Sequence, residues 1–292
     1  MRFRVWVVLL LFVSSCAFAQ TDSIKVRCKS VEDSLIYYFT QQRRATSDKD
    51  RIALNLIICK QFYTLFDISG SFSYALDSLK TCGHLYSPDK VFRLITWNVE
   101  MNDGTHVHYG FVQLSSNRRG KSFFELKDLS GRITNPEQSV LSAGKWYGGL
   151  YYKILRNKVD ARVYYTVLGL QYHNLFTTRK FIDVMYFDEY GNPVFGAPIF
   201  QFGVKQTKLR VIFEYSAMLT MSLRYDDLQK QIVFDHLSPS EPRYEGVYQY
   251  YGPDMSFDGL MFDKNRWVYI SKIETRKPDS VKVKSTKNAP IR

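Results

Sequence analysis

The stretch VFRLITWNVEMNDGTHVHYGFVQL, residues 91–114, decides the fold class of this chain. It consists of two runs rich in Val, Ile, Phe and Tyr on either side of Asn102-Asp103-Gly104. An Asn-Asp-Gly sequence between two β-prone runs is typical of a tight hairpin turn. The stretch therefore predicts two antiparallel strands joined by that turn.

The same pattern continues toward the C-terminus. Aromatic and β-branched runs recur, with a turn signal about every ten residues. These runs occupy residues 121–129, 146–171, 181–195, 209–234 and 258–273. The sequence therefore predicts a mainly β chain, an antiparallel meander, with its β domain over residues 89–275.

A faint repeat leaves the arrangement of the sheets open. An aromatic residue followed by Asp occurs at Phe187-Asp188, Tyr225-Asp226 and Phe262-Asp263, at intervals of 38 and 37 residues. Repeats near 40 residues are typical of propeller blades. Asp is also a common turn initiator, which would give the same repeat by chance. A sandwich or barrel and a propeller-like set of repeated sheets are both compatible with the sequence.

Toward the N-terminus, residues 20–88 have a helical pattern. Ser30 with Asp33, and Ser47 with Asp50, resemble capping boxes that would begin two helices. Apolar residues then recur at helical spacing after each of them. A short third helix is expected around residues 73–80.

The first 19 residues resemble a signal peptide. Arg2 and Arg4 precede an apolar run over Val5–Val13, which is too short to span a membrane. Ala17-Phe18-Ala19 then matches a cleavage site that would make Gln20 the first mature residue. The alternative is a lipoprotein site, in which Cys16 carries the lipid. Both interpretations predict an exported protein, in the periplasm or associated with the outer membrane, with no transmembrane segment in the mature chain.

The net charge limits the classes of partner, and the cysteines limit the disulfides that the chain can form. The formal net charge is +12, and much of it lies in residues 276–292, which predict a basic, flexible tail. Because the excess is not concentrated in the aromatic-rich body, we expect no nucleic acid partner. Cys28, Cys59 and Cys82 allow one disulfide in several pairings, which the sequence leaves open.

His106 and His108 are the sharpest candidates for chemistry. Residues two apart on a strand face the same side, so both imidazoles could bind a divalent metal. The acidic residues of the second half offer a candidate glycosidase pair. They are Glu214, Asp226, Asp235, Asp254 and Asp258. No nucleophile elbow, phosphate-binding loop or zinc-protease motif occurs in the sequence, and no cofactor is predicted.

Aromatic residues make up 16% of the chain, with more Tyr than a core alone should need, and several flank Gly or Pro where strands should end. Rings exposed at such loops suit contacts with a sugar or a protein. The candidate binding residues are Trp146, Tyr147, Tyr151, Tyr250, Tyr251 and Asp254.

Several segments resemble an uncharacterised family of exported proteins from Bacteroidota-type bacteria. They are NPVFGAPIF at 192–200, FEYSAMLTMSLRYD at 213–226, FDHLSPSEP at 234–242 and YGPDMSFDGLMF at 251–262, together with the Ala-Phe-Ala-Gln end of the leader. The resemblance covers about residues 91–275. The resemblance implies a protein of the Gram-negative cell envelope, and it assigns no activity to the chain.

Together these observations predict a non-catalytic cell-envelope protein that binds another envelope protein or a glycan through aromatic-lined loops. Two alternatives stay open. One is a periplasmic hydrolase, with a metal held by His106 and His108. The other is a structural subunit of an outer-membrane assembly.

Overall fold

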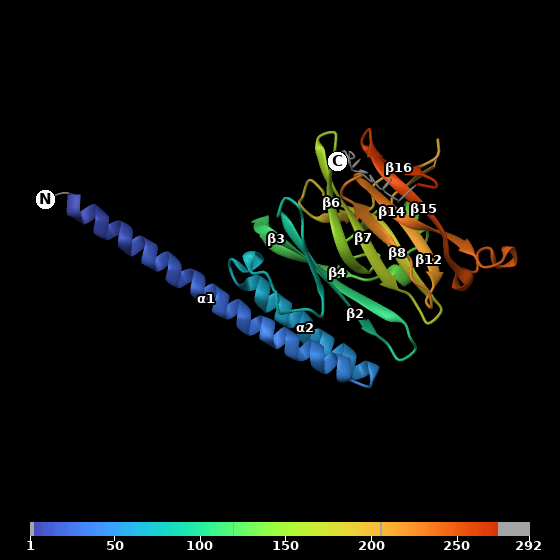
Figure 1. Cartoon of the computed structure of the whole chain (residues 1–292). Coiled ribbons are helices and arrows are strands. Elements are labelled where there is room, and N and C mark those ends of the chain that lie inside the picture. The colour runs from blue at the N-terminus through green and yellow to red at the C-terminus, as the bar shows by residue number, and fades with distance from the viewer. Residues whose placement is uncertain (1–2, 119, 205, 274–292) are drawn as a thin grey trace, which may run out of the picture.

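The computed structural model describes residues 3–118, 120–204 and 206–273, with side chains from residue 22 onward apart from residue 118. Two N-terminal helices precede sixteen strands within these ranges, so the predicted mainly β class is confirmed. The strands form three sheets that stack beside the helices in layers (Figure 1). The basic segment 276–292 lies outside the described residues.

The first sheet contains the hairpin that the sequence predicts over residues 91–114. Its strands are β1 (Gly83–Tyr86), β2 (Phe92–Glu100), β3 (His106–Arg118) and β4 (Lys121–Lys127), paired antiparallel in chain order. At the predicted turn, Asp103 Oδ1 accepts the Thr105 N–H at 2.8 Å and Gly104 has φ +76°. The local turn chemistry therefore sets the β2–β3 register.

The second sheet is central. Its strands are β5 (Leu141–Ser142), β6 (Leu150–Val159), β7 (Arg162–Tyr172), β8 (Thr177–Phe187), β9 (Pro193–Phe195) and β12 (Val211–Ser216). The order is β5-β9-β8-β7-β6, and β12 pairs with the first half of β8.

The third sheet lies farthest from the helices. Its strands are β10 (Phe200–Phe202), β11 (Gln206–Lys208), β13 (Leu223–Asp226), β14 (Gln231–Pro239), β15 (Tyr251–Asp263) and β16 (Arg266–Ile270). The order is β11-β10-β16-β15-β14-β13. The β10–β16 pair is parallel, so the sheets are not a pure antiparallel meander.

Alternation along the strands of the first and second sheets builds a core on both faces of each sheet. On β2, Phe92 points into a core shared with the second sheet, whereas Trp97 points into a core shared with the helices. On β8, Phe181 faces the first sheet and Ile182 faces the third. Because the side-chain period of a strand is two, the sheets stack with a separate apolar core in each interval.

The stacked layers distinguish between the arrangements that the sequence left open. The chain forms a layered sandwich of sheets rather than a ring of propeller blades (Figure 1). The repeated aromatic–Asp pairs end β8, β13 and β15. They belong to two different sheets and mark strand ends, so they are turn signals and not blade repeats.

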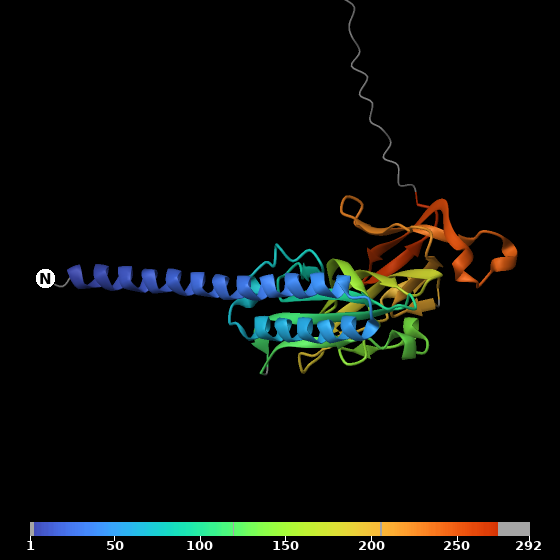
Figure 2. The ribbon, with the colours of Figure 1, turned by 90° about the horizontal axis from the view of Figure 1, so that it is seen from below.

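Helix α2 (Asp48–Asp67) and the C-terminal part of helix α1 (Phe3–Arg44) lie side by side over the outer face of the first sheet, and the N-terminal part of α1 extends beyond them (Figure 2). The predicted cap at Ser47 is confirmed, since its Oγ accepts the Asp50 N–H at 3.1 Å. Ser30 does not begin a helix. It lies inside α1, because no Gly or Pro interrupts residues 3–44.

Two smaller expectations also need correction. Strand β1 precedes residue 89, so the predicted boundary at residue 88 would cut through the first sheet. The expected third helix is only the 3₁₀ turn Ser71–Ser73. Cys28, Cys59 and Cys82 are all free thiols in this structure.

The predicted leader is the first part of α1, and the side chain of Cys16 lies outside the described part. Among the described residues, no helix combines the length and the apolar character that crossing a membrane would require.

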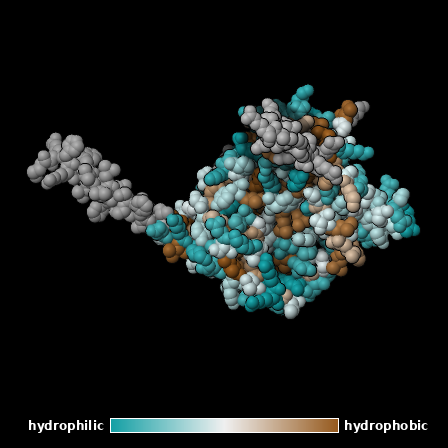
Figure 3. Space-filling model, in the orientation of Figure 1, coloured by the Kyte–Doolittle hydropathy of each residue, from teal (hydrophilic) through white to brown (hydrophobic). Residues whose placement is uncertain are grey.

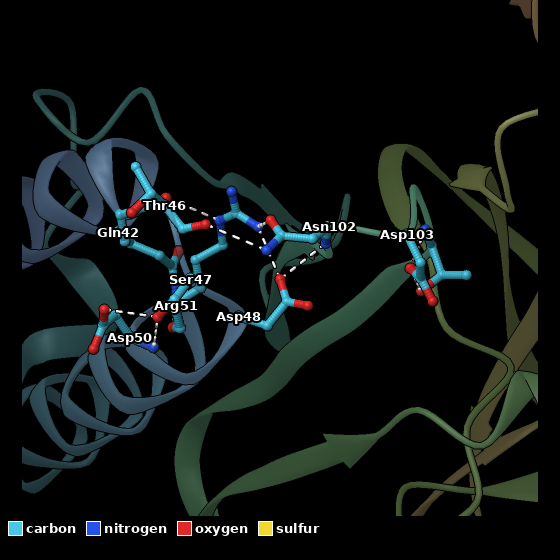
Figure 4. A network of polar contacts seen from close by, with 10 residues as sticks. Gln42, Thr46, Ser47, Asp48, Asp50, Arg51, Asn102 and Asp103 are labelled. Carbon is cyan, nitrogen blue, oxygen red and sulfur yellow. Dashed lines mark hydrogen bonds and ion pairs between the residues drawn. The ribbon is translucent and has the colours of Figure 1, made fainter.

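A polar clamp joins the turn between the helices to the β2–β3 turn (Figure 4). Asp48 Oδ1 accepts the Asn102 N–H at 2.9 Å and pairs with Arg51 Nη1 at 2.9 Å. Arg51 Nη1 also donates to Asn102 Oδ1 at 2.5 Å, and Asn102 Nδ2 donates to the Thr46 carbonyl at 3.3 Å. Two local turns are thereby fixed against each other across the helix–sheet interface.

Candidate functional site

Two features lie together at the end of the molecule remote from the helices. One is the excursion between β14 and β15, residues 240–251, which we call the tyrosine hairpin. It projects from the strand ends of the third sheet in both views, and its last residue, Tyr251, is the first residue of β15 (Figures 1 and 2). The other is a pocket between the second and third sheets, which we call the inter-sheet pocket.

The tyrosine hairpin presents a stack of rings to solvent. The Tyr244 and Tyr250 rings lie 4.1 Å apart with an interplanar angle of 27°. The Arg243 guanidinium lies 4.8 Å from the Tyr244 ring centre. Tyr248 and Tyr250 are 46% and 41% exposed, far more than a core ring would be.

Internal hydrogen bonds hold this hairpin in one shape. The Tyr250 carbonyl accepts the Ser240 N–H at 2.9 Å, and the Tyr251 hydroxyl accepts the Gly246 N–H at 2.9 Å. Gly246 has φ +81°, a conformation that favours glycine. The exposed rings are therefore preorganised, which lowers the entropy cost of binding.

The inter-sheet pocket has a volume of about 590 Å³. Its lining comes from β10, β11, β12, β14, β15 and β16. The lining residues are Phe202, Gly203, Gln206, Phe213, Phe234, Asp235, His236, Leu237, Asp258 and Tyr269. A pocket of this size with apolar walls and a few convergent polar groups has the form of a small-molecule site.

Four aromatic rings form a continuous row along the pocket. Phe213 of β12 lies 4.6 Å from Phe234, Phe234 lies 6.5 Å from Tyr269, and Tyr269 lies 5.0 Å from Phe202. The interplanar angles along the row are 44°, 30° and 25°. The Phe234–Tyr269 and Tyr269–Phe202 pairs are stacked, and Phe213 from the second sheet extends the row, so the rings form one continuous apolar wall.

A β-bulge directs the polar end of the pocket. The β14–β15 register is interrupted between Asp235 and Leu237, so His236 is opposed by residues 254–256. Met255 in this bulge has φ +71°. Bulges bend a strand and redirect its side chains, and here the redirected side chain is His236, which is 45% exposed.

Asp258 holds that imidazole in place. Its Oδ2 lies 2.6 Å from His236 Nδ1 and accepts the Tyr269 hydroxyl at 2.8 Å, while Oδ1 accepts the Lys272 N–H at 3.0 Å. Assigned from this network, the Nδ1–H of His236 donates to the carboxylate. In the neutral imidazole, this tautomer leaves Nε2 as a hydrogen-bond acceptor on a side chain that lines the pocket.

The electrostatics agree with an ionised Asp258. Burial raises the pKa of this carboxyl. The hydrogen bonds from His236, Lys272 and Tyr269 lower the pKa by a larger amount, so that it lies below its usual value. Burial and the hydrogen bond to Asp258 raise the pKa of Tyr269 to about 12, so its hydroxyl stays protonated. The pair is thus a carboxylate that orients an imidazole.

Three of the predicted binding residues are not available at the surface. Trp146, Tyr147 and Tyr151 are 0%, 1% and 3% exposed, within the core between the first and second sheets. Trp146 Nε1 donates to the Tyr151 hydroxyl at 2.8 Å. The neighbouring Gly149 does not mark an exposed loop, because a Cβ there would lie 2.6 Å from the Phe181 ring. These three rings are core residues in this structure.

The other predicted binding residues do lie at the candidate site. Tyr250 and Tyr251 belong to the tyrosine hairpin. Asp254 lies in the bulge opposite His236, where its Oδ1 accepts the Ser256 N–H at 2.9 Å. Sequence reasoning missed Phe202 and Phe213, because nothing in their local sequence indicates that they meet across two sheets.

The two histidines predicted as metal ligands have other partners. His106 Nδ1 lies 2.7 Å from Asn98 Nδ2, and His108 Nδ1 lies 3.1 Å from Asp128 Oδ2. His108 is only 2% exposed. Within the described part of the chain, no group of three or more His, Cys, Asp and Glu side chains could hold a metal ion.

On the face seen in Figure 3, hydrophobic side chains are interspersed among hydrophilic ones. Comparisons of the chain with family models, with curated proteins and with solved structures find no match.

Proposed function

We propose that this is an exported, non-catalytic protein of the bacterial cell envelope that binds a partner protein through the tyrosine hairpin. The observation that carries the proposal is the preorganised stack of Tyr244 and Tyr250 with Tyr248 exposed beside it. Rigid tyrosines next to an arginine are the residues that dominate binding energy in protein interfaces. Arg243 supplies the arginine, over the face of Tyr244.

Export rests on the N-terminal sequence alone. The cationic start, the apolar run over Val5–Val13 and the Ala17-Phe18-Ala19 site support removal of a leader. Mass measurement of the protein isolated from its native envelope tests this. A mature chain that begins at Gln20 supports release, a lipid mass on Cys16 supports an anchored form, and an intact Met1 in the cytosolic fraction contradicts export.

Partner binding is tested by crosslinking in isolated envelopes, with the tagged full chain as bait. We expect the Tyr248→Ala/Tyr250→Ala variant to lose its partner at least about tenfold, because truncated hot-spot rings cost about 2 kcal/mol or more. The matched control is Tyr37→Ala, since Tyr37 is 58% exposed on α1. The same crosslinked partners at the same yield in wild type and double variant would contradict the proposal.

A further inference from the structure

We infer that the inter-sheet pocket is a second, independent binding site, and that it takes a neutral saccharide of about one or two sugar units. It shares no residue with the exposed rings of the tyrosine hairpin. The inference therefore stands or falls separately from the proposed protein partner.

The size and walls of the pocket set the ligand class. A volume of about 590 Å³ lies within the usual range for small-molecule sites. The row of Phe213, Phe234, Tyr269 and Phe202 lines the pocket with aromatic surface against which the C–H groups of a sugar ring can pack. Phe213, Tyr269 and Phe202 are only partly buried, so part of the surface of each residue is accessible.

The polar groups of the pocket are suited to hydroxyls. His236 Nε2 is an acceptor, and Nδ1 is held by Asp258 at 2.6 Å. Asp235 and Gln206 add a carboxylate and an amide to the lining. A sugar has both apolar C–H faces and hydroxyl groups. It therefore matches a row of aromatic rings that ends in the polar groups of His236, Asp235 and Gln206.

Charge argues against an anionic ligand. Two carboxylates, Asp235 and Asp258, line the pocket. The nearby Lys208 is already paired with Glu137 at 2.7 Å, with its ammonium 5.2 Å from the Phe202 ring centre. A phosphate or carboxylate would therefore meet repulsion, and the lining residues that the structure describes include no Lys or Arg to offset it.

The geometry of the rings argues against an ammonium ligand. Aromatic sites for ammonium groups surround the cation with ring faces. Here the rings are inclined by only 25–44° along a row, so they form one wall and not a cage. Asp258 already accepts hydrogen bonds from His236, Tyr269 and Lys272, which leaves it poorly placed to pair with a second cation.

The experiment is saturation-transfer NMR, followed by titration calorimetry, on the full chain. The probes are maltose, cellobiose and lactose, with choline and glucose 6-phosphate for comparison. We expect at least one disaccharide to bind at up to about 10 mM, with the strongest transfer to the C–H protons of one sugar face. Choline and glucose 6-phosphate should not bind.

Substitutions in the lining test whether the saccharide binds in the inter-sheet pocket. Phe213→Ala and His236→Leu should each weaken binding about 5- to 20-fold, from loss of ring packing and of the acceptor. His236→Gln should retain more affinity than His236→Leu, because its amide oxygen still accepts a hydroxyl. Tyr248→Ala is the matched control. It should leave saccharide binding unchanged even if it abolishes partner crosslinking.

Three outcomes would overturn the inference: a folded protein that binds none of the disaccharides, affinities that the Phe213 and His236 variants leave unchanged, or tighter binding of choline or glucose 6-phosphate at this pocket. Thermal unfolding of each variant confirms that it is folded before its binding is compared.

Discussion

The molecule contains two histidine–aspartate pairs of the same chemistry in opposite surroundings. In the His108–Asp128 pair the side chains are 1% and 8% exposed, whereas in the His236–Asp258 pair they are 45% and 4% exposed. The first pair is closed off where β4 approaches residues 146–148. The second borders the inter-sheet pocket. One pair can serve only the fold, and the other can also contact a ligand.

The aromatic clusters differ in the same way. Under the helices, Trp97 stacks on Phe62 at 5.1 Å and lies 5.8 Å from Phe111, and all three are 2% exposed or less. In the inter-sheet pocket the rings of Phe202, Phe213 and Tyr269 keep part of their surface exposed. The same residue types therefore stabilise one region and are available for recognition in the other, depending on what covers them.

The largest expected effect separates the two aromatic clusters. Trp97→Ala should reduce the free energy of unfolding by about 3–5 kcal/mol, because a buried ring is removed and Asn55 Oδ1 loses the closer of its two donors, Trp97 Nε1 at 2.7 Å. Phe213→Ala, at the partly exposed pocket, should cost about 1–2 kcal/mol. Urea unfolding measures both changes. Equal losses for the two variants would contradict the difference in burial between the Trp97 cluster and the rings of the inter-sheet pocket.

The two histidine pairs should differ by a smaller amount. His108→Leu should lower the free energy of unfolding by about 2–4 kcal/mol, because it removes one partner of the buried Asp128 carboxylate. His236→Leu should cost about 1 kcal/mol or less, since that imidazole is half exposed and solvent already screens its pairing with Asp258. The check is denaturant unfolding at neutral pH. A larger loss of stability for His236→Leu than for His108→Leu would contradict the view that His108–Asp128 is the pair that stabilises the fold.

The polar clamp should matter less than either core. Asp48→Ala removes the acceptor for the Asn102 N–H and the partner of Arg51, at an expected cost of about 1–2 kcal/mol. Lys49→Ala, at an exposed neighbouring position, is the control and should change stability by less than about 0.5 kcal/mol. Thermal denaturation of both variants gives the comparison. An unchanged melting temperature for Asp48→Ala would show that the clamp adds nothing.

The smallest effect is on the pH dependence. Hydrogen bonds hold the pKa of Asp258 below its unfolded value. The sign follows from linkage: this stabilisation is complete above the unfolded pKa of about 3.9, and it is lost as the pH falls through the lower folded pKa. Asp258→Asn should therefore show a shallower loss of stability than wild type between about pH 5 and pH 2. Parallel pH profiles for the two proteins would contradict this.

Local signals in the sequence predicted local structure well. The Asn102-Asp103-Gly104 turn and the Ser47 cap both formed as expected, because each depends on backbone conformation and one side-chain hydrogen bond nearby. Ser30 failed as a helix start because an uninterrupted helix-compatible sequence outweighs a capping pattern.

The site residues were predicted less well, for a long-range reason. Trp146 and Tyr147 precede two glycines, which suggested an exposed loop. The glycines instead allow close approach of Asp128 and Phe181, which are distant in sequence. Likewise, Phe213 and Phe202 belong to different sheets, and their place in one row of rings has no signal in either strand.

The sequence by itself determined the class of the fold, since turn chemistry and alternating apolar residues act over a few positions and repeat along the chain. Only the tertiary structure decided which histidine, and which aromatic cluster, stays open to solvent. Exposure depends on the layer that packs against a side chain, and that layer comes from residues far along the chain. For His236, the bulge at residues 254–256 and the packing of β12 against the third sheet make that decision.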